Sequence, residues 1–189
     1  MSTATLVAVI VSAIIVVGAI AYVATKQRSQ RLKTRFGPEY NRTTEETGSK
    51  TKAEAKLEKL ARRVDRFKIN PLSPAARADF VATWQQIQGR FVDDPKGALT
   101  EADRLIQRIM TARGYPVTDF DQRAADVSVD HPLVVEHFRA GHEISLRHSQ
   151  GRASTEDMRQ AMIHYRTLFT ELAEEPELTR SPTARAAGA

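Results

Sequence analysis

The apolar positions divide the chain into one continuous run and a longer part in which they recur at helical spacing. The run from Leu6 to Thr25 contains no charged side chain. A helix of that length rises about 30 Å, which matches the hydrocarbon core of a bilayer. The pattern therefore predicts a short N-terminal segment, 1–5, followed by a transmembrane helix over 6–25.

Beyond residue 50 the spacing of apolar residues predicts amphipathic helices. Leu57, Leu60 and Val64 fall on one helical face, and similar stripes recur along the chain. Helix starts are indicated where a capping side chain precedes a proline or an acidic residue, and helix ends where glycine follows the stripe. Predicted starts lie at Ser73-Pro74, Asp94-Pro95, Asp130-His131-Pro132 and Ser154, with ends at Gly114 and Gly151.

The fold class predicted from these elements is all-α. No segment alternates long enough to predict a strand. We expect a transmembrane helix and then a soluble bundle of about four long helices and one short one, over 51–173. A polar tail over 174–189 is predicted to be disordered.

The segment 26–50 is predicted to be a basic juxtamembrane helix and connector. Phe36-Gly37-Pro38 breaks the first helix, since glycine frees the backbone and proline fits the first turn of a new helix. We expect Phe36 and Tyr40 to lie at the depth of the lipid head groups.

Charge gives the predicted transmembrane helix a direction. Five cationic residues follow the apolar run and none precedes it. The positive-inside rule then places the N-terminus outside and the C-terminal domain in the cytoplasm of a single-pass protein of the cell membrane. A signal peptide is disfavoured, because its apolar run would be shorter and would follow basic residues. The membrane-surface residues are Lys26, Arg28, Arg31, Lys33 and Arg35.

The distribution of charge also bears on partners. Residues 26–70 hold 14 Lys or Arg against six Asp or Glu, whereas the chain from Pro71 onward holds 14 against 17. Because the excess positive charge lies next to the apolar run, it favours a bilayer with anionic head groups as its partner. A nucleic-acid partner is disfavoured, since its basic patch would lie on the folded domain.

No catalytic, cofactor or metal site emerges from the sequence. Cysteine is absent, so a thiolate site is excluded. The five histidines do not share the i, i+3 or i, i+4 spacing of ligands on one helix, and the glycines do not form a phosphate-binding loop. Asp93-Asp94 and Asp119/Asp121 stand where helix caps are expected. We therefore expect a protein that is not an enzyme and binds no cofactor.

One long irregular connection, made of the loop 113–116, a short helix and residues 126–132, is a candidate surface for a protein partner. Loops of this length in compact domains are often functional. The alternative is that Tyr115 and Phe120 only fix the loop to the bundle. The candidate residues are Tyr115, Phe120, Arg123 and His131.

Three strings suggest a family resemblance. RFGPEY at 35–40, RGYP at 113–116 and DVSVDHP at 126–132, after an N-terminal apolar segment, resemble an uncharacterised family of small bacterial membrane-anchored proteins. The resemblance implies a helical architecture and a bacterial cell envelope, and it implies no activity.

Three hypotheses of function follow. The first is a membrane-tethered, non-enzymatic helical interaction module for a protein partner. The second is a membrane-linked regulatory domain that binds a small ligand within the bundle. The third is a protein that self-associates through 57–67 or through the small residues Ala8, Ser12 and Gly18. A filled apolar core would favour the first over the second.

Overall fold

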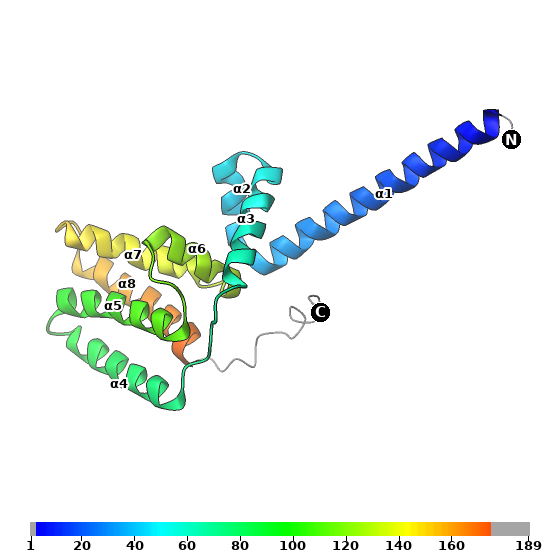
Figure 1. Ribbon diagram of the computed structural model, residues 1–189. Coiled ribbons are helices and arrows are strands. Elements are labelled where there is room, and N and C mark those ends of the chain that lie inside the picture. The colour runs from blue at the N-terminus through cyan, green and yellow to red at the C-terminus, as the bar shows by residue number, and fades with distance from the viewer. Residues whose placement is uncertain (1–2, 175–189) are drawn as a thin grey trace. The chain divides into compact units, whose positions relative to one another are not determined.

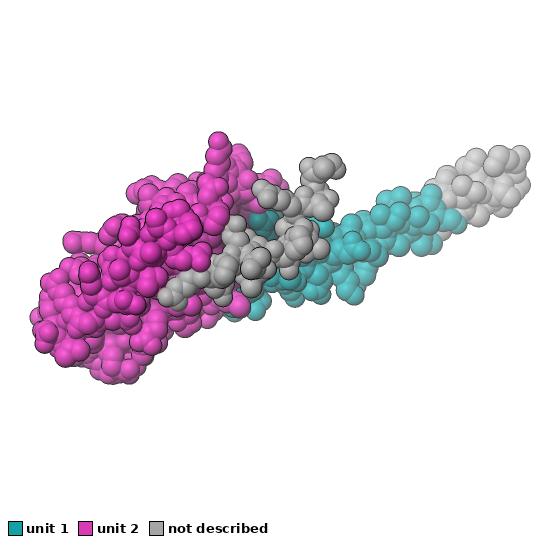
Figure 2. Space-filling view, turned by 90° about the horizontal axis from the view of Figure 1, so that it is seen from below, with its two compact units in different colours: residues 1–59 teal, residues 60–189 magenta. Residues whose placement is uncertain are grey.

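The computed structural model describes residues 3–174, with side chains described from residue 12 to residue 173. Every regular element in this part of the chain is a helix, which confirms the all-α class (Figure 1). The chain divides into two compact units, unit 1 over residues 1–59 and unit 2 over residues 60–189 (Figure 2).

Among the described residues, no helix is long and apolar enough to cross a membrane. The first helix, α1, spans Thr3–Phe36. The absence of such a helix among the described residues contradicts the predicted transmembrane helix over 6–25. It also contradicts the predicted single-pass protein of the cell membrane with an outside N-terminus and a cytoplasmic domain.

Unit 1 is built from α1, α2 (Pro38–Thr47) and the larger part of α3 (Lys50–Val64). The chain turns at Gly37, whose φ of 49° is accessible to glycine, and Pro38 opens α2 as predicted. Phe36 and Tyr40 are 0% and 4% exposed. Their predicted place at head-group depth is therefore wrong, because both rings fill the core of this unit.

Unit 2 is a helical bundle. Helix α8 packs against both α5 and α7, while α4 packs on α5 and α6 on α7 (Figure 1). Trp84 of α4 stacks on Phe169 with ring centres 5.1 Å apart, and both side chains lie in the core. The elements are α4 (Pro74–Arg90), α5 (Pro95–Arg113), α6 (Phe120–Asp130), α7 (Val135–Ser149), α8 (Thr155–Phe169) and the π-helical turn η1 (Thr170–Glu174).

Most helix boundaries of unit 2 follow the predicted capping chemistry. The side chains of Ser73 and Asp94 accept hydrogen bonds from the backbone N–H of Ala76 and Gly97. Ser154 and Asp157 form a reciprocal capping box at the start of α8. These contacts satisfy backbone donors that have no partner within the first turn of a helix.

The boundary between α6 and α7 differs from the prediction. Asp119 caps α6, and the helix continues to Asp130. His131 then ends α6, and α7 begins only at Val135 without a side-chain cap. The predicted start at Asp130-His131-Pro132 is therefore wrong, because the buried Val127 and Val129 extend α6 to Asp130.

Candidate interaction surface

The N-terminal part of α1 presents the most prominent apolar surface in the described part of the chain. Every described side chain from Ser12 to Arg28 is exposed. Twelve large apolar side chains are exposed among the described residues, and seven of them lie on this segment at 50–68% exposure. These seven are Ile14, Ile15, Val16, Val17, Ile20, Tyr22 and Val23. We call residues 12–25 the apolar segment of α1.

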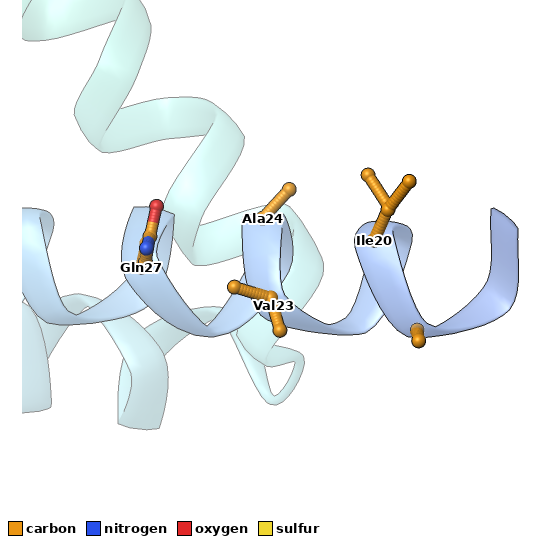
Figure 3. A pocket seen from close by; sticks show the side chains of 5 residues that line it. Ile20, Val23, Ala24 and Gln27 are labelled. Atoms are coloured by element: carbon orange, nitrogen blue, oxygen red, sulfur yellow. The ribbon is translucent and has the colours of Figure 1, made fainter. Parts of the chain in front are cut away.

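A shallow hollow lies along this helix (Figure 3). All of its lining residues belong to α1 and follow the i, i+3, i+4 spacing of one helical face. The hollow carries one polar side chain, Gln27, and no group that could act as an acid, a base or a nucleophile. It therefore offers a surface for apolar contact. Its lining residues are Ala19, Ile20, Val23, Ala24 and Gln27.

The five basic residues predicted to face a membrane continue α1 beyond the apolar segment. Four of them are exposed, and Arg35 is half-buried. Arg28 forms an ion pair with Glu58 of α3, with 2.7 Å between Nη2 and Oε2, and Lys33 lies over the ring of Tyr40. Their predicted contact with anionic head groups rested on the membrane-spanning helix and loses that basis.

A buried polar cluster in unit 1 was not found from the sequence. Oε1 of Glu54 accepts hydrogen bonds from the hydroxyls of Ser29 and Tyr40, at 2.6 and 2.8 Å. Burial, the strongest single influence, raises the pKa of Glu54, but these two hydrogen bonds and the charges of Lys50 and Arg28 outweigh it and lower that pKa overall. The carboxylate thus stays ionised and joins α1, α2 and α3. No sequence signal reveals this cluster, since its members lie up to 25 positions apart.

Of the four residues predicted to face a protein partner, two are buried. Tyr115 and His131 are 3% and 7% exposed, and Nδ1–H of His131 donates to Oε1 of Glu171 at 2.6 Å. Phe120 and Arg123 are half-buried. The ring of Phe120 packs on Phe138 and also stacks on the ring of His142 of α7. The partner surface stays a prediction, and only Phe120 and Arg123 expose side-chain area for it.

A polar network joins three helices of unit 2. The hydroxyl of Tyr165, on α8, donates to Oδ1 of Asp103 on α5 at 2.8 Å and lies 3.0 Å from Oγ of Ser145 on α7. Burial and the charge of Asp103 raise the pKa of Tyr165, so the phenol stays neutral and acts as a donor. The network holds α5, α7 and α8 together, and Tyr165 is too deeply buried to meet a substrate.

Two histidines of α7 have distinct surroundings. His142 stacks on Phe120 at 3.6 Å between ring centres, and burial lowers its pKa against the opposing charge of Asp103. Nδ1 of His137 lies 2.9 Å from Nδ1 of His164 on α8. Neither arrangement provides a serine or cysteine nucleophile next to a base.

Asp126 is the most deeply buried carboxyl group of unit 2, at 1% exposure. Its Oδ1 accepts hydrogen bonds from Gln122 and Arg63, at 2.8 and 3.2 Å, while Oδ2 has no hydrogen-bond partner. Burial raises its pKa despite these two partners. Among the described residues no group of three or more His, Asp or Glu side chains could hold a metal ion.

Comparisons of this chain with protein-family models, with curated proteins and with solved structures return no match. The arguments that follow therefore rest on the geometry described above.

Proposed function

We propose that this protein is a non-enzymatic helical interaction module that binds a protein partner through the apolar segment of α1. The observation that carries the proposal is the exposure of seven large apolar side chains within ten consecutive positions, 14–23. Exposed apolar patches of this kind mark contact surfaces.

The energy available from this segment supports a stable contact. Each valine or isoleucine side chain that moves from water into a packed contact contributes about 1.5–3 kcal/mol. Association costs about 4–15 kcal/mol in lost freedom of motion. A partner that covers four or five of the exposed side chains offsets that cost, whereas isolated exposed residues such as Val92 and Val117 do not.

The interior of unit 2 supports an interaction role over the binding of a small ligand. Its core is a continuous set of buried apolar residues from α4, α5, α7 and α8, including Trp84, Leu105 and Phe138. Tyr165, the largest fully buried side chain, has its hydroxyl satisfied by other side chains. A bundle that accommodates a ligand would hold polar groups pointing into a cavity.

Chemical cross-linking in cells, followed by affinity purification and mass spectrometry, tests the proposal. We expect the wild-type chain to yield a specific cross-linked protein, and the double variant Ile14→Asn/Val17→Asn to yield at least tenfold less of it. The matched control is Val92→Asn/Val117→Asn, which alters two apolar side chains of even higher exposure elsewhere. Equal cross-linking in the α1 variant and the wild type would contradict the proposal.

A further inference from the structure

The contact between His137 and His164 joins the first turn of α7 to the last turns of α8. The two Nδ1 atoms are 2.9 Å apart, and the ring centres are 5.2 Å apart. This centre-to-centre separation places both Nδ1 atoms close to the line between the rings. Such head-on alignment suits a linear N–H···N hydrogen bond.

Proton counting shows what this hydrogen bond requires. A neutral imidazole has one N–H and one acceptor nitrogen. One ring must therefore be the Nδ1–H tautomer, and the other must accept at Nδ1. One added proton makes the pair positively charged and leaves this hydrogen bond intact, because the Nδ1 of the second ring still accepts. A second proton removes the acceptor, so two N–H groups and two positive charges face each other.

The packing around the pair keeps the two helices close. A Cβ atom at Gly141 would lie 3.3 Å from the ring of Tyr165 and 3.6 Å from Cβ of His164, so glycine allows α7 to approach α8 here. Both histidines are half-buried. Burial, and next the charge of His137, lowers the pKa of His164.

Charged groups on the neighbouring elements act mainly on other residues. Asp103 of α5 accepts from Tyr165, while Asp121 and Arg123 of α6 act on His142. Asp130 accepts from Tyr115, and Glu171 of η1 accepts from His131. Along the two helices themselves, the charged side chains within two positions of the pair are Glu136, Arg139 and Arg166.

We propose that His137 and His164 form a proton-dependent contact that holds the start of α7 against the end of α8 at neutral pH and separates once both rings are protonated. Helices α7 and α8 are joined by the short connection 150–154, so this contact lies at the opposite, open end of their hairpin. η1 continues directly from that end of α8.

The direction of the pH effect follows from linkage. A histidine whose folded-state pKa is lowered binds fewer protons in the folded protein than in the unfolded chain. Its contribution to stability is complete above the ordinary pKa of 6.5 and is lost as the pH falls through the lowered folded-state pKa. His142 has a lowered pKa as well, so the test must separate the two contributions.

NMR of the ring nitrogens tests the tautomers directly. At pH 7.5 we expect one of the two histidines to be the Nδ1–H tautomer. On acidification to pH 5 we expect amide protection at the start of α7 and the end of α8 to fall about tenfold. Two Nε2–H tautomers at pH 7.5 would overturn the proposal.

Variants distinguish this contact from other titrating groups. His164→Gln, and the apolar pair His137→Phe/His164→Phe in case the first variant unfolds, should remove the acid-induced loss of protection at this end. His148→Gln, on the last turn of α7, should retain it, and His142 still titrates in every variant. An unchanged pH dependence in the folded His137 and His164 variants would also overturn the proposal.

Discussion

At the scale of single residues, the interior of unit 2 is specified by a few polar groups placed among apolar ones. Tyr165 has no solvent exposure, and its hydroxyl contacts both Asp103 and Ser145. A buried hydroxyl without partners would be costly, so these contacts select one arrangement of α5, α7 and α8.

We expect Tyr165→Phe to lower the free energy of unfolding by about 1–2 kcal/mol, because Asp103 and Ser145 lose a hydrogen-bond partner. Denaturant unfolding followed by circular dichroism measures the change. Tyr22→Phe is the matched control, since Tyr22 is 68% exposed and its replacement should leave the stability unchanged. Equal stabilities of the two variants would show that the network contributes nothing.

The sequence predicts part of this residue-level picture. The apolar stripes that contain Trp84, Leu105 and Phe138 could be identified from their spacing, and all three are buried. The partners of Tyr165 could not, because Asp103 lies 62 positions away and its pairing depends on how three helices pack. The buried Glu54 was missed for the same reason.

At the scale of elements, local chemistry decides most helix ends. Ser73, Asp94 and Ser154 cap helices where the sequence predicts them, because a capping bond involves residues only three positions apart. The end of α6 is different. Burial of Val127 and Val129 carries α6 as far as Asp130, where the local signal predicts the start of the next helix, so tertiary packing overrides capping there.

Gly114 ends α5 and offers a sharp test of an element boundary. Its φ is 97°, and a Cβ atom there would lie 2.4 Å from the carbonyl oxygen of Lys68. We expect Gly114→Ala to lower the free energy of unfolding by more than about 1 kcal/mol. Gly89→Ala, inside α4 with no atom near its Cβ position, should be neutral or stabilising by about 0.5–1 kcal/mol. Thermal unfolding of both variants measures the difference, and a loss of stability at Gly89 equal to that at Gly114 would contradict this explanation.

At the scale of the whole molecule, the two units have different characters. Unit 2 buries its large apolar residues in one core, whereas α1 of unit 1 leaves its apolar segment uncovered by any described residue. The sequence identified that segment as the most apolar part of the chain, but its predicted role as a membrane-spanning helix is contradicted by the described structure. The exposure of these side chains in unit 1 is what the proposed interaction role explains.

A photoreactive amino acid at position 17, compared with one at position 85, tests this role most directly. Val17 lies in the apolar segment of α1, and Gln85 is an exposed polar residue of α4. We expect irradiation of cells to link position 17 to a defined protein, either another chain or a second copy of this one, and position 85 to none. Adducts of position 17 with lipid alone, or no adduct at all, would contradict the proposed function.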